Sequence, residues 1–108
     1  MHIVQIHTDY EHAERYTEVS LTPVANIETA QKALVSLVRK AFKKYDITVN
    51  PVVDDANYRS IENDDETVDC STDDHYCIST VKKPSATKPV AELVIEESAL
   101  TIEWYLVK

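Results

Sequence analysis

Alternation of apolar and polar residues marks the start of the chain as two strands. Residues 2–8 alternate, with Val4 and Ile6 on one face, and residues 15–21 alternate in the same way. A polar, turn-like stretch over 9–13 separates the two segments. Period-two alternation on both sides of a short polar connection predicts a β-hairpin.

The next segment changes to a helical period. Apolar residues recur every three or four positions over about residues 25–45 and form one broad stripe. Pro23 and Asn26 are typical of a helix start, and Glu28 suits the positive end of the helix dipole. Lysines crowd the last turns, where positive charge is favourable. The stripe consists of Ile27, Ala30, Leu34, Leu37, Val38, Ala41 and Tyr45.

The remaining chain returns to strand-like patterns. Pro51 indicates that the first of these strands lies at an edge or ends early, and a polar loop bounded by prolines spans 83–89. The last two strands are joined across 97–99 and predict a second hairpin. The predicted strands are 47–53, 58–61, 67–70, 76–82, 91–96 and 100–107.

Together these elements predict an α+β fold in which one long amphipathic helix packs on a mostly antiparallel sheet of about five or six strands. We expect residues 1–108 to form a single domain, because 108 residues suffice for one hydrophobic core and not for two ordinary ones. The predicted core joins Ile27, Leu34, Val38 and Ala41 of the helix to Val4, Ile6, Ile102 and Trp104 of the sheet.

Glycine is absent from the chain. Phosphate-cradling loops, dinucleotide fingerprints and nucleophile elbows need glycine where the backbone takes a positive φ or closely approaches a ligand. None of them is present in standard form. We therefore expect a non-enzymatic protein without a cofactor, and we expect its turns to use Asn, Asp, Ser and Pro.

Potential metal ligands gather in two places without a convincing ligand set. His2 and His7 point to opposite faces of a strand because their spacing is odd. Asp69, Ser71 and Asp73 match half of a calcium loop, but Asp74 replaces its glycine and Thr80 its bidentate acid. His75, which lies near Cys77, is the only residue that loosely suggests a catalytic base, and no serine or cysteine has the local signature of a nucleophile. We expect no metal site, and we expect Cys70 and Cys77 to be reduced thiols, with a regulatory disulfide or a metal site as alternatives.

The chain has a net charge of −8, unevenly distributed. Residues 22–45 carry five basic residues against Glu28, whereas residues 46–77 carry ten acidic residues against Arg59. The overall negative charge argues against direct binding of nucleic acid by the basic helix. No apolar stretch approaches the length needed to span a bilayer, and no signal peptide is visible, so we expect a cytoplasmic protein without a membrane partner.

The acidic segment is the predicted binding surface. Electrostatic complementarity would direct it to a basic protein surface, most readily that of a nucleic-acid-binding protein, with two tyrosines as anchors. In size and charge alone the chain resembles the small phage and mobile-element inhibitors that mimic DNA, such as anti-CRISPR and anti-restriction proteins. The alternatives are a solubilising loop, a structural subunit that homo-oligomerises through sheet edges, and a small hydrolase or metal-dependent enzyme. The predicted partner-binding residues are Asp54, Asp55, Tyr58, Glu62, Asp64, Asp65, Glu66, Asp69, Asp73, Asp74 and Tyr76.

Overall fold

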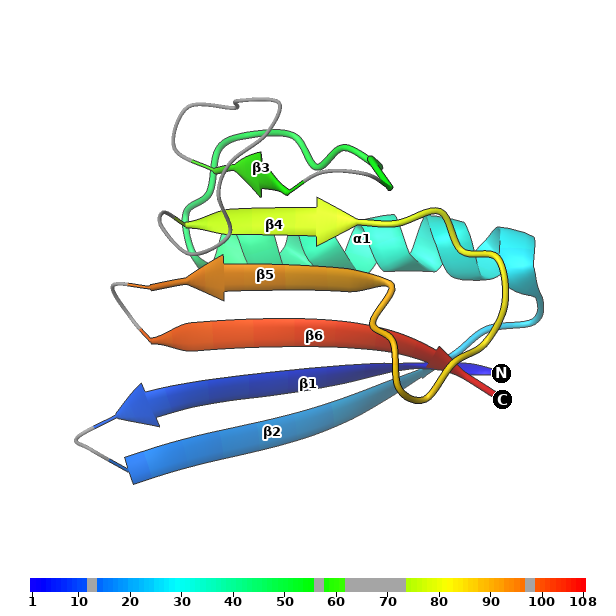
Figure 1. Cartoon of the computed structure of the whole chain (residues 1–108), viewed down its shortest axis with the longest axis horizontal. Helices are drawn as coiled ribbons and strands as arrows, with labels where there is room; N and C mark the ends of the chain where they lie inside the picture. Colours follow the sequence, from blue (N-terminus) through cyan, green and yellow to red (C-terminus); the bar gives the residue numbers. More distant parts are fainter. Residues whose placement is uncertain (12–13, 56–57, 62–73, 97–98) are drawn as a thin grey trace.

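A computed structural model shows one helix packed on a six-stranded antiparallel sheet, which confirms the α+β class (Figure 1). The sheet order is β2-β1-β6-β5-β4-β3. The strands are β1 (His2–Glu11), β2 (Glu14–Pro23), β3 (Arg59–Ser60), β4 (His75–Ile78), β5 (Ala91–Ile95) and β6 (Leu100–Val107). The structure describes residues 1–11, 14–55, 58–61, 74–96 and 99–108.

The helix α1 (Ile27–Lys44) begins and ends with identifiable caps. At its start, the Asn26 side chain accepts a hydrogen bond from the Thr29 amide, and the Thr29 hydroxyl interacts in return with the Asn26 amide. This reciprocal capping box satisfies amides that the helix itself leaves unpaired. At its end, Asp46 takes a φ of 56°, in the left-handed region usually occupied by glycine. Aspartate tolerates this region better than most residues, so it ends the helix in a chain without glycine.

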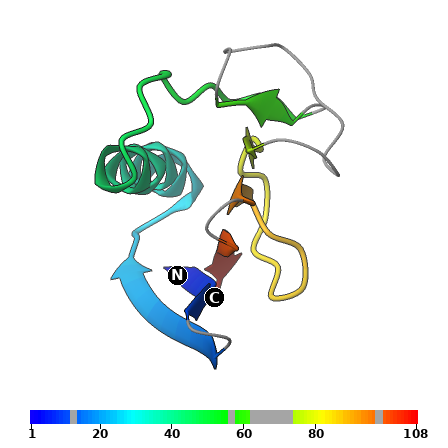
Figure 2. The same cartoon turned by 90° about the vertical axis from the view of Figure 1, so that its left-hand side faces the viewer.

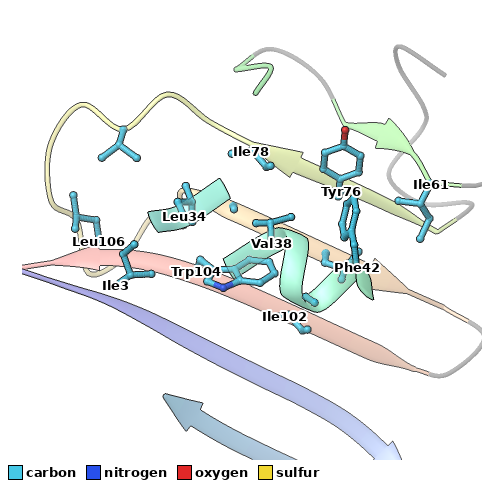
Figure 3. Close-up of a cluster of buried hydrophobic side chains, with 14 of the residues drawn as sticks. Ile3, Leu34, Val38, Phe42, Ile61, Tyr76, Ile78, Ile102, Trp104 and Leu106 are labelled. Atoms are coloured by element: carbon cyan, nitrogen blue, oxygen red, sulfur yellow. The ribbon is translucent and has the colours of Figure 1, made fainter. Parts of the chain in front are cut away.

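The core lies between α1 and one face of the sheet (Figure 3). Leu34, Val38 and Phe42 of the helix are almost completely buried. Trp104 of β6 is also fully buried, and its indole Nε1–H donates a 2.8 Å hydrogen bond to Oε1 of Gln5. The rest of the core comes from alternate residues of the central strands, chiefly Ile3, Tyr76, Ile78, Leu93, Ile102 and Leu106.

The predicted inward face of β1 was wrong. The register pairs Ile3 with Leu106 and Gln5 with Trp104, so these residues face the helix. Val4 and Ile6 therefore lie on the opposite side of the sheet. The polar Gln5 is suited to this inward position because its amide oxygen accepts the hydrogen bond from the indole N–H of Trp104. A buried tryptophan needs such an acceptor.

Three other strand predictions need correction. Residues 47–53 form no strand; the amide of Ile47 bonds to the carbonyl of Phe42, and that of Val52 bonds to the Tyr76 hydroxyl. The strand predicted over 76–82 is the shorter β4. The strand predicted over 58–61 is the two-residue β3, and the one over 67–70 lies outside the described residues. Both predicted hairpins, β1–β2 and β5–β6, are confirmed.

Candidate partner-binding surface

The helix covers only one side of the sheet, as Figure 2 shows. We call the opposite side the open face. Because side chains alternate along each strand, the register fixes which residues lie on it. The open face includes Val19 and Leu21 of β2, Val4 and Ile6 of β1, Glu103 and Tyr105 of β6, Glu92 and Val94 of β5, and His75 and Cys77 of β4.

Two glutamates lie directly opposite each other at the centre of this face. Glu92 of β5 pairs with Glu103 of β6, and the Tyr105 hydroxyl donates a 2.9 Å hydrogen bond to Oε2 of Glu103. Partial burial raises the pKa of Glu92, the neighbouring Glu103 raises it further, and His75 acts in the opposite direction. The pKa of Tyr105 is also raised, by burial and by its hydrogen bond to Glu103. The strands therefore hold negative charges together at the expense of monomer stability.

A cavity of about 280 Å³ adjoins Glu92. Asp55, Tyr58 and Cys77 are among its lining residues, together with Lys88. The Asp55 carboxylate accepts a hydrogen bond from the backbone amide of Thr80, and this bond is the main cause of its lowered pKa. Asp55 is exposed, so its negative charge is presented at the rim of the cavity.

The aromatic and thiol groups of this cavity have distinct environments. The Tyr58 ring meets His75 edge-on, with 5.2 Å between the ring centroids, and His75 is buried. Burial is the main cause of the raised pKa of Cys77, and the nearby Asp54 raises it further. A raised pKa keeps the thiol protonated at neutral pH, which makes it a poor nucleophile.

The other predicted site residues within the described ranges have structural partners. Asp54 forms a 3.5 Å ion pair with Arg59, and Asp74 accepts a 2.9 Å hydrogen bond from the Glu96 amide. Tyr76 is fully buried, with its ring edge-on to Phe42, so it is a core residue and not the surface anchor that we predicted. The remaining predicted residues, Glu62, Asp64, Asp65, Glu66, Asp69 and Asp73, lie outside the described residues.

Glu92 and Glu103 were not among the predicted site residues. Each lies in a segment of balanced charge, so a search for acidic runs misses them. The available signal was the hairpin itself, because pairing residues 91–95 with 100–104 brings the two carboxylates onto one face. The pair of Glu92 and Glu103 becomes apparent only from the register of β5 and β6.

Metal ligands do not converge in the part of the chain that the structure describes. His2 and His7 lie on opposite faces of β1, as their spacing predicts, and Nε2 of His7 lies 3.0 Å from Oδ2 of Asp9. No group of three or more His, Cys, Asp or Glu side chains among the described residues is arranged to hold a metal ion. The half-match to a calcium loop, residues 69–73, lies outside these ranges. Cys77 is a free thiol, and Cys70 is not described.

Within the described ranges, no helix combines the length and the apolar character needed to cross a membrane. No family model matches the chain, and no curated protein or solved structure is significantly similar to it. Function is therefore inferred from the chemistry of the open face and its cavity.

Proposed function

We propose that this protein is a non-enzymatic binding module whose acidic surface engages a basic protein surface, as an inhibitor of a nucleic-acid-binding protein would. The opposed pair of Glu92 and Glu103 carries the proposal. Like charges directly across two strands destabilise a sheet by about 0.2–1 kcal/mol. Two arginine or lysine side chains of a partner would convert this repulsion into attraction.

The surroundings of the pair supply the other requirements of a binding surface. Charged surfaces speed encounter and select the partner, whereas aromatic residues in pockets contribute much of the binding energy. Tyr105 adjoins the glutamates, and Tyr58 lines the neighbouring cavity beside Asp55. Apolar side chains of β1 and β2 extend the same face. A partner that presents cationic groups beside an apolar patch fits this distribution.

The residues that flank the acidic run over 62–73 contact each other. Ile61 and Asp74, which flank it, are joined by a 3.2 Å bond from the Ile61 amide to the Asp74 carbonyl. Asp74 precedes β4, and Ile61 follows β3, which pairs with β4. Its six acidic residues belong to the proposal as predicted additional contacts.

The test begins with proteins captured from an extract of the source cell by immobilised wild-type protein. Each captured protein is purified and titrated against wild type and against the double variant Glu92→Gln, Glu103→Gln. The matched control removes two acids at the ends of α1, Glu28→Gln and Asp46→Asn, on the other side of the sheet.

We expect the Glu92, Glu103 variant to bind at least about tenfold more weakly, since close charge pairs at interfaces contribute 1.5 kcal/mol or more. We expect the control to bind like wild type. Binding should weaken with salt and should compete with DNA if the partner uses its nucleic-acid site. Equal affinity of wild type and both variants in low and physiological salt would refute the proposal.

A further inference from the structure

The two edges of the sheet differ greatly. The edge strand β3 has two residues, whereas β2 at the other edge has ten. Val19 and Leu21 of β2 are 58% and 64% exposed. A long edge strand with exposed apolar side chains presents unpaired backbone groups and is a template for a further strand.

The two faces of β2 have different chemistry. On the open face, Val19 lies beside Ile6 and Leu21 lies beside Val4, so the apolar surface continues to the edge. On the helix side, Glu18 lies beside His7. An added strand would therefore meet apolar side chains on one face and polar ones on the other.

A groove of about 270 Å³ lies between β2 and the helix. Ser20 of β2 lines one wall, and Lys40 and Lys44 of α1 line the other. Both lysines are exposed, and no carboxylate among the described residues lies within ion-pair distance of either. Figure 2 shows β2 turning out of the plane of the central strands toward the side that carries α1. A strand added to β2 would thus bring its helix-side residues toward this basic groove.

We propose that a second copy of this chain occupies the edge, with its β2 antiparallel to β2 and the two-fold axis at Val19. In this register, Glu18 lies opposite Ser20 of the second copy, at the mouth of the groove that carries Lys40 and Lys44. Val19 meets its own symmetry mate on the open face, with Leu21 on the diagonal. A two-fold interface uses the same surface on both copies. Here β2 of each copy supplies Glu18 for the lysines of the other copy and Val19 and Leu21 for its apolar face.

Neighbouring registers fit less well. An axis at Ser20 would oppose Val19 to Leu21 but would put Glu18 opposite Thr22, which does not line the groove. An axis at Glu18 would oppose two identical carboxylates, which destabilises a strand pair. A register shifted by one residue would place the helices on opposite sides of the joined sheet, which a two-fold axis cannot produce, and would pair apolar with polar faces. The charge of −8 on each chain opposes association at long range, but charges further apart than about 8 Å are largely screened at physiological salt.

The first test is the molar mass in solution, measured by sedimentation equilibrium over a micromolar concentration series. We expect wild type to dimerise. Leu21→Glu should raise the dimer dissociation constant at least about tenfold, because two leucines per dimer lose their apolar contacts. The matched control is Val53→Glu, which adds the same charge at an exposed valine outside the sheet. It should dimerise like wild type.

Two further variants test the register and the charge pairing. Val19→Cys, in a Cys70→Ser, Cys77→Ser background, should form a disulfide-linked dimer on mild oxidation, because directly opposed Cα atoms lie within disulfide range. Val53→Cys in the same background should not. Glu18→Lys should weaken dimerisation, and adding Lys40→Glu and Lys44→Glu should restore it.

A wild-type protein that stays monomeric across the series would overturn the proposal and leave the edge to a strand of another protein. A dimer that Leu21→Glu leaves intact, or that Val19→Cys does not trap, would also overturn it. The Glu92→Gln, Glu103→Gln variant should dimerise normally, because neither residue lies on β2. The two proposals can therefore fail independently: loss of dimerisation concerns the β2 edge, and loss of partner binding concerns the acidic surface.

Discussion

Replacing Glu92 with glutamine should stabilise the isolated protein while weakening partner binding. The substitution keeps the size and shape of the side chain and removes one of two directly opposed charges. It also removes the cost of partly burying a carboxylate, the main cause of its raised pKa. From the cross-strand repulsion we expect a gain of about 0.2–1 kcal/mol in the free energy of unfolding at pH 7.

The gain should depend on pH. A carboxyl with a raised pKa in the folded state holds its proton more tightly when the chain is folded. Its contribution to stability is complete below the pKa of the unfolded state and is lost as pH rises through the folded-state pKa. The difference between Glu92→Gln and wild type should therefore be small below about pH 4 and should grow toward neutral pH.

Urea unfolding followed by fluorescence of Trp104 measures this difference. With an m-value of about 1.5 kcal/mol/M, the midpoint at pH 7 should rise by roughly 0.1–0.7 M. Glu96→Gln is the control, because Glu96 is exposed and lies beyond the end of β5. A variant less stable than wild type at pH 7, or a gain independent of pH, would refute the repulsion between Glu92 and Glu103.

Three further substitutions test the fold. Leu34→Ala should cost about 2–5 kcal/mol in a denaturant melt, because Leu34 is fully buried; a change below about 0.5 kcal/mol would contradict the packing of α1 on the sheet. Gln5→Met should cost about 1–3 kcal/mol and alter Trp104 fluorescence, since the indole N–H loses its acceptor; an unchanged midpoint would contradict this role. Ala99→Gly should raise the free energy of unfolding by about 0.5–1 kcal/mol, because Ala99 has a φ of 49°, which glycine adopts without a steric penalty. A lower free energy of unfolding in a thermal or chemical melt would contradict that backbone conformation.

The sequence alone determined the elements with an unambiguous period. The apolar stripe of α1 lies on one face of the helix, so only that face can be buried. The helix ends are also recognisable, from Asn26 at the start and the basic residues of the last turn. The final strand alternates strictly, with Trp104 among its inward residues, so its buried face could be read directly. These patterns were sufficient for the α+β class.

Tertiary structure decided what local patterns leave ambiguous. Both faces of β1 carry apolar residues, and only pairing with β6 turns Ile3 inward and Val4 outward. Tyr76 lies in an acidic stretch of sequence, yet packing against Phe42 makes it a core residue. The opposed pair of Glu92 and Glu103 likewise exists only in the register of β5 and β6. Composition and periodicity report on one segment at a time. Which face of a strand is buried, and which charges cluster, depends on contacts between segments, and these contacts are fixed only when the sheet is assembled.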